Sequence, residues 1–171
     1  MRHRGILRFG VAITALTLAT AGCRPPQTCV ERTAALEGMA VETIAFVTAE
    51  GRRIRTSAWI ADEPAQRRAG FQHLCPETVA RRPMWFQFQR PARVGFHMHN
   101  VHAPLDLAFV DAAGVVFEIR RMAPVSRERP ARTVLPDRPI VAAVEAADGW
   151  FARRGIEPGA RATREPSKRA Q

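Results

Sequence analysis

Two alternating apolar runs joined by a turn constrain the fold of this chain more than any other feature. The first run places Leu105, Leu107 and Phe109 at every second position, and residues 115–119 repeat the pattern after the turn. Side chains alternate between the two faces of a strand, so each run predicts a half-buried strand. Gly114 suits the positive φ that a tight turn requires. The segment therefore predicts a β-hairpin.

Similar β-forming runs occur along the rest of the chain. Residues 41–50 and 53–61 predict an opening hairpin, because the second run alternates strictly and a glutamate–glycine turn separates the two. Three further strands are expected at residues 84–88, 140–145 and 160–163. Pairs of neighbouring runs with short connections are typical of a sheet built from hairpins.

Short helices are expected between these strands. Asp62 precedes Glu63 and Pro64 and predicts the N-cap of a helix that ends at Gly70. Residues 75–83 predict a loop or one more turn, and residues 146–154 predict a short helix. Many short strands separated by Gly and Pro favour an all-β fold, namely a small sandwich or barrel with two or three short helices. We expect it to form one domain over residues 41–164.

The first 22 residues have the pattern of a signal peptide. Arg2, Arg4 and Arg8 give a basic N-terminal region, residues 6–19 give a short, mostly apolar run, and Ala21 and Gly22 stand directly before Cys23. Small residues before a cysteine resemble the bacterial lipoprotein signal, although Thr20 stands where that signal usually has Leu. We therefore expect a periplasmic lipoprotein anchored to the membrane through lipidated Cys23. The alternative is cleavage after Ala21, which gives a soluble secreted protein.

The segments that flank the domain are polar. Residues 23–40 predict a tether between the membrane and the domain, and residues 165–171 predict a basic, disordered tail. Of the three cysteines, lipidation of Cys23 leaves Cys29 and Cys75 as a pair in an oxidising compartment. We predict a disulfide between them, and the alternative is two free thiols.

Three of the five histidines stand close together. In an extended segment His97 and His99 project from one face, so both imidazoles can reach one ion, with His102 folding back as a third ligand. This arrangement would suit a transition metal such as Zn, Cu or Ni. The alternative is that His97 and His99 face solvent and His102 caps the turn before Pro104, in which case no cofactor is expected.

The other face of the same segment carries Phe96, Met98 and Asn100. Together with Pro104 and Asp106, these residues form an edge that we expect to bind a ligand. Asp106 stands between two apolar residues and has an alternative, structural role. It can accept hydrogen bonds from backbone amides of the loop at residues 100–103.

No complete catalytic constellation is present in the sequence. It contains no Gly-x-Ser-x-Gly, phosphate-binding loop, dinucleotide fingerprint or Cys-x-x-Cys motif. The formal net charge is +10, but the basic residues are dispersed, with no block of five or more. This dispersion argues against a nucleic-acid partner. We therefore expect a non-catalytic binding module rather than an enzyme.

Four short motifs resemble, in their order, those of the bacterial and archaeal proteins of domain of unknown function 192 (DUF192). They are Ala69-Gly70-Phe71-Gln72, Pro83-Met84-Trp85-Phe86, Phe96-His97-Met98-His99-Asn100-Val101, and Pro104-Leu105-Asp106 with Phe109, Asp111 and Gly114. Later positions also match the family pattern: Val144-Glu145, Gly149, Gly155-Ile156 and Gly159. The resemblance spans about residues 41–164. It implies a small, mostly β fold, and many family members look exported or lipid-anchored, but it implies no established activity.

This sequence departs from the family pattern in the third motif. His97, His99 and Val101 stand where the family has Trp, Lys and Thr. The leading interpretation is an exported cell-envelope domain that binds an envelope protein or a small ligand at the His97–Asp106 edge. The alternative is a metal-binding protein or metal-dependent enzyme that uses His97, His99 and His102.

Overall fold

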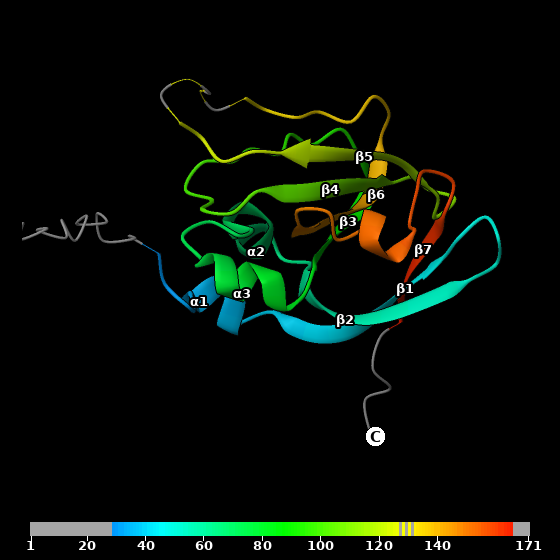
Figure 1. The fold of residues 1–171 in the computed structure, drawn as a ribbon, viewed down its shortest axis with the longest axis horizontal. Coiled ribbons are helices and arrows are strands. Elements are labelled where there is room, and N and C mark those ends of the chain that lie inside the picture. The colour runs from blue at the N-terminus through cyan, green and yellow to red at the C-terminus, as the bar shows by residue number, and fades with distance from the viewer. Residues whose placement is uncertain (1–28, 127, 129, 131, 166–171) are drawn as a thin grey trace, which may run out of the picture.

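The computed structural model of the chain describes residues 29–126, 128, 130 and 132–165 (Figure 1). Its elements are α1 (Ala34–Glu37), β1 (Ala40–Val47), β2 (Arg53–Ala61), α2 (Pro64–Ala69), α3 (Pro76–Arg81), β3 (Met84–Ala92), β4 (Leu105–Val110), β5 (Val116–Met122), β6 (Ile140–Ala147), the 3₁₀ helix η1 (Ala152–Arg154) and β7 (Arg161–Glu165). The expected signal peptide, Cys23, the first part of the tether and the tail from residue 166 lie outside the described residues.

A single seven-stranded sheet in the described part of the chain confirms the all-β prediction. Its strand order is β5-β4-β6-β3-β2-β1-β7. The hairpins β1–β2 and β4–β5 form as predicted, with antiparallel registers such as Ala108 opposite Ile119. Among the strand pairings of this sheet, only the short β2–β3 pairing is parallel. It is reached through the segment that contains α2 and α3, because a parallel neighbour requires a crossover connection.

The sheet is curled, so its two edge strands, β5 and β7, meet at one end. The backbone N–H of Val116 donates to the carbonyl of Ala160 at 2.8 Å, and the N–H of Ala162 donates to Gly114 at 2.8 Å. An isolated bridge between Val115 and Arg161 lies between these two bonds. The sheet is therefore a partly closed barrel, and the hairpin turn before β5 supplies the closing contacts.

Two hydrophobic clusters lie on the two faces of this curled sheet. The enclosed cluster draws side chains from all seven strands and includes Phe46, Ile60 and Trp85. The 147–156 segment adds Trp150 and Phe151 to it. This segment is not the helix predicted for residues 146–154: β6 continues to Ala147, a turn follows, and only residues 152–154 form a 3₁₀ helix. The aromatic pair still reaches the core, as expected.

The second cluster lies on the outer face of β4, β6, β3 and β2, beneath the short helices and loops. It contains Leu105, Leu107 and Phe109, the residues of the first alternating run. Leu36 and Met39 from the predicted tether segment are also buried in this cluster. The helices α1, α2 and α3 gather on one side of the molecule, away from β7 (Figure 1).

The helix α2 begins one residue later than predicted. Glu63, not Asp62, is its N-cap, and the Gln66 side chain accepts a hydrogen bond from the Glu63 backbone N–H at 3.1 Å. Gln66 is buried and donates to the carbonyl of Gly38 at 3.0 Å, which fixes α2 to the end of α1. Asp62 instead pairs with Arg164 at 3.0 Å. The helix has only six residues, so these tertiary contacts hold it in place.

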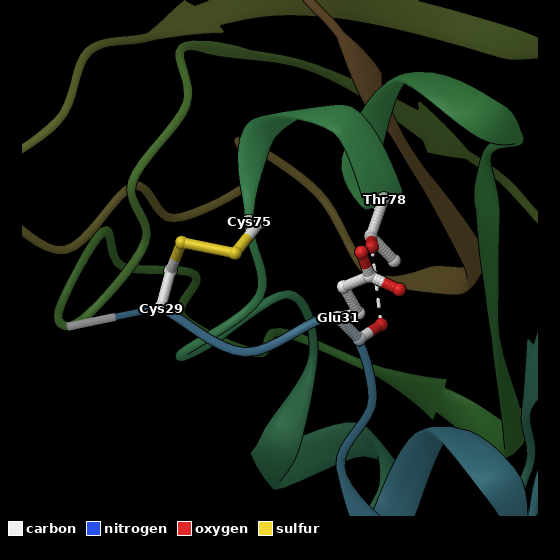
Figure 2. The surroundings of a disulfide bond; sticks show 4 residues. All are labelled: Cys29, Glu31, Cys75 and Thr78. Atoms are coloured by element: carbon white, nitrogen blue, oxygen red, sulfur yellow. Dashed lines mark hydrogen bonds between the residues drawn. A yellow bond between two sulfur atoms is a disulfide. The ribbon is translucent and has the colours of Figure 1, made fainter. Parts of the chain in front are cut away.

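Cys29 and Cys75 form a disulfide in the structure, as predicted (Figure 2). Their Cα atoms are 4.9 Å apart. Next to the bridge, Val30 pairs with Leu74, and the Thr78 hydroxyl donates to the carbonyl of Glu31 at 3.0 Å (Figure 2). The disulfide therefore joins the N-terminal segment to the loop that leads into α3.

Candidate functional site

A pocket of about 560 Å³ lies between α2 and the outer face of the sheet. One wall comes from α2 and the residues that follow it, and the other comes from the loop between β3 and β4. The strand β3 contributes Phe86 and Phe88, and β6 contributes a single side chain, Glu145. Segments that are far apart in the sequence thus converge on one concave site, which is the usual form of a ligand pocket.

Glu145 lies on a central strand among apolar neighbours. The strand β6 is flanked by β3 and β4, and Glu145 stands between Met84 and Leu107 in the register. Its neighbours at alternate positions, Ala143 and Ala147, face the outer cluster, so the carboxyl group faces the same way. Glu145 is only 5% exposed.

The Glu145 carboxyl group has no hydrogen-bond or ion-pair partner among the residues that the structure describes. Burial in this apolar site raises its pKa to about 8. Removing a carboxylate from water without a compensating charge favours the neutral acid. At pH 7 the protonated form is therefore favoured, and it carries a hydrogen that it can donate.

Gly70 leaves the space beside this carboxyl group open. A Cβ atom built at Gly70 would lie 3.7 Å from Oε2 of Glu145 and 3.6 Å from Cζ of Phe86. Gly70 has φ 49° and ψ −138°, which differs from the left-handed C-cap predicted for it but still has positive φ. Because this conformation favours glycine, the backbone turns over the carboxyl group without placing a side chain there.

Two arginines of α2 line the same pocket. The Arg67 guanidinium donates to the carbonyl oxygens of Asp62 and Gln87 and lies 5.6 Å from the ring centre of Phe88. Its position is thus fixed by backbone acceptors and an aromatic ring rather than by Glu145. Arg68 is exposed. The pocket therefore combines a cationic side with a neutral, buried acid.

Aromatic side chains make much of the remaining wall. Phe86 and Phe96 meet edge to face, with ring centres 5.4 Å apart and an interplanar angle of 87°. Phe96 also contacts Phe109 beneath it at 5.7 Å. Packing from two directions fixes the Phe96 ring, so this wall is formed before any ligand arrives.

The structure separates the residues predicted as a binding edge. Phe96 lines the pocket and is buried. Met98 is buried beside a different hollow near β5, and Asn100 and Pro104 are exposed outside the pocket. His97, predicted for the opposite face, lies on the pocket with Phe96.

Asp106 lies on the other face of the sheet from Phe96 and Leu107. It is 7% exposed and accepts hydrogen bonds from the backbone amides of residues 149–151. Burial and the nearby charge of Asp148 raise the pKa of its carboxyl group, while the amide bonds oppose the rise. Asp106 therefore binds backbone amides, but those of the turn after β6 rather than of residues 100–103. It holds the turn that brings Trp150 and Phe151 into the enclosed cluster.

His97 and His99 are neighbours on the surface. Their ring centres are 5.2 Å apart, and Nδ1 of His97 accepts the backbone N–H of His99 at 3.3 Å. His102 is also exposed. Within the described ranges, no group of three or more His, Cys, Asp or Glu side chains is arranged to hold a metal ion.

Glu145 is not among the site residues predicted from the sequence, although the sequence contains a signal at this position. The strand Ile140–Ala147 is apolar except at this residue, and a charged residue inside a buried strand is uncommon. The resemblance also included Val144-Glu145 as a matching pair. Neither observation reveals that a helix and a distant loop enclose a pocket over the carboxyl group.

The sequence matches a protein-family model over most of the described domain. The model of the DUF192 family, described as "Uncharacterized ACR", matches residues 45–163. No curated protein matches the sequence.

Two solved structures share the fold. One, described as a proposed transcription regulator from Sinorhizobium meliloti, is 26% identical, with a TM-score of 0.66 and coverage of 74% of this chain and 95% of its own. The other, a protein of unknown function from Novosphingobium aromaticivorans, is 24% identical, with a TM-score of 0.63 and coverage of 77% and 97%. The second similarity concerns the fold alone.

Proposed function

This chain belongs to the DUF192 family, and on that premise we propose that it is a cell-envelope binding module whose pocket beneath α2 takes a small, mainly apolar molecule. The observation that carries the proposal is the convergence of family motifs on this pocket. Three of the four motifs contribute to its lining, through residues 69–72, Phe86 and the segment that contains Phe96 and His97. Glu145, which belongs to the later family match Val144-Glu145, forms the floor of the pocket.

The size and chemistry of the pocket support a small-molecule ligand. A volume of about 560 Å³ lies within the range of roughly 300–1,000 Å³ that is common for such sites. Its walls are largely aromatic, and a small number of polar groups stand at defined positions. An apolar ligand body would replace water against Phe71, Phe86 and Phe96, which is the main source of affinity in such pockets.

The proposed compartment is the periplasm, with Cys23 as the lipidated anchor. The Cys29–Cys75 disulfide supports export, because such bonds persist in oxidising compartments and are rare in the cytosol. In the part of the chain that the structure describes, no helix is long and apolar enough to span a membrane. Membrane attachment is proposed to depend on the lipid at Cys23, the cysteine that follows the signal-like segment.

Binding in the pocket can be tested with cumene (isopropylbenzene) as the probe and the exported protein as the sample. We expect cumene to shift the NMR signals of the pocket residues at saturable concentration. Ala69→Trp places a large ring in the pocket lining and should abolish these shifts. Ala65→Trp is the matched control, because Ala65 is exposed on the same helix and does not line the pocket. Equal binding by wild type and Ala69→Trp would contradict the proposal.

The anchor can be tested separately by cell fractionation. Wild-type protein should be recovered with membranes, and its N-terminal peptide should carry the mass of a lipid on Cys23. Cys23→Ala should remove the lipid mass and release the protein from the membranes. A wild-type mature protein that begins at Gly22 and carries no lipid would show soluble secretion instead.

A further inference from the structure

We infer that Glu145 sets the specificity of this pocket: its protonated carboxyl group donates a hydrogen bond to an oxygen atom of an uncharged, mainly apolar ligand, such as a ketone, ester or amide. The inference rests on the proposed binding function and adds the chemical class of the ligand. It depends on the isolation of Glu145, the opening beside Gly70 and the distribution of charge around the pocket.

The carboxyl group of Glu145 can form its hydrogen bond with a ligand, because no protein group competes for it among the described residues. No described residue bonds to it, and its strand neighbours in the register are Met84 and Leu107. Glu145 is 5% exposed and lines the pocket, so a ligand there can supply the hydrogen-bond partner that the protein does not. Gly70 keeps the approach to Oε2 free of a side chain.

The charged groups on the pocket disfavour a cationic ligand. Besides Glu145, the titratable or charged side chains that line it are Arg67 and Arg68 of α2 and His97 of the loop before β4. Phe86 and Phe88, the residues of β3 that line the pocket, carry no charge. An amine that paired with ionised Glu145 would have to lie beside two arginines and displace the bound proton. A neutral ligand with an acceptor oxygen brings no positive charge next to the arginines and leaves the proton on Glu145.

The walls define the rest of the ligand. Phe71, Phe86, Phe88 and Phe96 offer apolar surface around the acid, and Arg67 is already bound to backbone carbonyls and stacked on Phe88. A ligand with one acceptor oxygen at its inner end and an apolar body would satisfy both the buried donor and the aromatic walls. A ligand without an acceptor would leave the Glu145 hydroxyl without a partner.

Three probes with the same number of heavy atoms test this class. They are acetophenone, which has an acceptor oxygen, cumene, which has none, and 1-phenylethylamine, which is a cation near neutral pH. Affinities are to be measured by NMR titration at pH 6 for wild type, Glu145→Gln and Glu145→Leu. Glu145→Gln retains a donor, whereas Glu145→Leu is apolar and of similar size.

We expect the affinity ratio of acetophenone to cumene to fall about fivefold in Glu145→Leu and to stay near its wild-type value in Glu145→Gln. A fivefold change corresponds to one ordinary hydrogen bond of about 1 kcal/mol. Using the ratio cancels the general effect of each substitution on the pocket. Thermal unfolding of each variant confirms that it is folded, and cumene binding shows that its pocket is intact.

The pH dependence provides a second readout. In wild type the ratio should fall between pH 6 and pH 9.5, as the donor loses its proton, and in Glu145→Gln it should stay constant. His97→Gln removes the imidazole that also lines the pocket, and the wild-type dependence should persist in this variant.

Each contrary outcome has a distinct meaning. A ratio unchanged in Glu145→Leu overturns the inference and leaves the binding function standing. Preference for 1-phenylethylamine, lost in Glu145→Leu, overturns it in favour of a cation site. Failure of all three probes to bind the wild-type pocket overturns the proposed binding of small apolar molecules and the inference with it.

Discussion

His73 and Asn100 meet backbone to backbone beside the pocket, and both adopt positive φ. The N–H of His73 donates to the carbonyl of Asn100 at 2.7 Å, and the φ angles are 63° and 54°. The bond joins the loop after α2 to the loop before β4, the two loops that form opposite parts of the pocket wall. The His73 carbonyl in turn accepts the N–H of Val30 at 2.8 Å, next to the disulfide. The disulfide, the two strained residues and the pocket wall are therefore contiguous.

Changing Asn100 should test this backbone strain. Asn100→Val should lower the free energy of unfolding by about 1–2 kcal/mol, because a β-branched residue tolerates positive φ poorly, whereas Asn100→Gly should be neutral or stabilising. Urea denaturation of the two variants provides the measurement. Equal destabilisation by Val and Gly would indicate that the asparagine side chain, rather than its backbone, is what matters.

Removing the disulfide should destabilise the domain. The two cysteines are 46 positions apart, and the chain-entropy model assigns a loop of this size up to about 4 kcal/mol. The Cys29→Ser/Cys75→Ser double variant should therefore unfold at lower urea concentration than wild type. Alkylation of the unreduced protein, followed by mass spectrometry, should find neither Cys29 nor Cys75 labelled. Labelling of both before reduction would contradict the bridge.

Asp106 should prove important for stability and dispensable for pocket binding. Asp106→Leu removes the acceptor of three backbone amides, and we expect it to cost about 1–3 kcal/mol or more of unfolding free energy. Asp106→Asn should cost less, since one side-chain oxygen remains. Cumene should still bind Asp106→Asn. Loss of cumene binding in that folded variant would favour the binding edge expected from the sequence over the pocket beneath α2.

The histidine pair should bind transition metal weakly. Two adjacent imidazoles without a third ligand among the described residues provide an incomplete site for Zn²⁺. Equilibrium dialysis against Zn²⁺, followed by metal analysis, should find less than one equivalent retained at micromolar concentration. A stoichiometric metal that is lost in the His97→Ala/His99→Ala double variant would instead support the metal-dependent alternative.

The sequence was most informative where structure is set by local pattern. The alternation at Leu105, Leu107 and Phe109 predicted both the hairpin and its buried face, because a period of two depends only on the pleat of a strand. The Cys29–Cys75 pairing followed from counting cysteines in a chain that the sequence predicts to be exported. These features do not depend on how distant segments pack.

The pocket depends on contacts between distant segments and could not be predicted in the same way. Glu145 becomes a pocket floor only because α2 and the loop before β4 line the space over its carboxyl group, with Gly70 beside Oε2. Asp106 occupies the adjacent strand but faces the opposite cluster, where it binds the turn after β6. Two carboxylates that look alike in the sequence thus acquire different roles from the face on which they lie.

The stability of the domain should fall with rising pH because of Glu145. The group has an ordinary pKa of 4.5 and a folded-state pKa of about 8, so between these values the folded state holds more protons than the unfolded state. The free energy of unfolding therefore decreases as pH rises through this range, with no further loss above it. Each pKa unit corresponds to about 1.4 kcal/mol, so the total is several kcal/mol at most.

Glu145→Gln should remove this dependence. Urea denaturation at pH 5, 7 and 9 should show the variant gaining stability relative to wild type as pH rises, because its amide never ionises. Other titrating groups affect both proteins equally and cancel in the comparison. Parallel pH profiles for the two proteins would contradict a buried, protonated Glu145.

The most direct test of the account is the titration of Glu145 itself, followed by the ¹³C shift of its carboxyl carbon. The signal is assigned by its absence in Glu145→Gln and observed from pH 3 to pH 10. A buried, unpartnered acid at the floor of the pocket predicts a midpoint near pH 8. A midpoint between pH 4 and pH 5 would show a carboxylate that is ionised and solvated at neutral pH, and would contradict both the buried donor and the ligand class inferred from it.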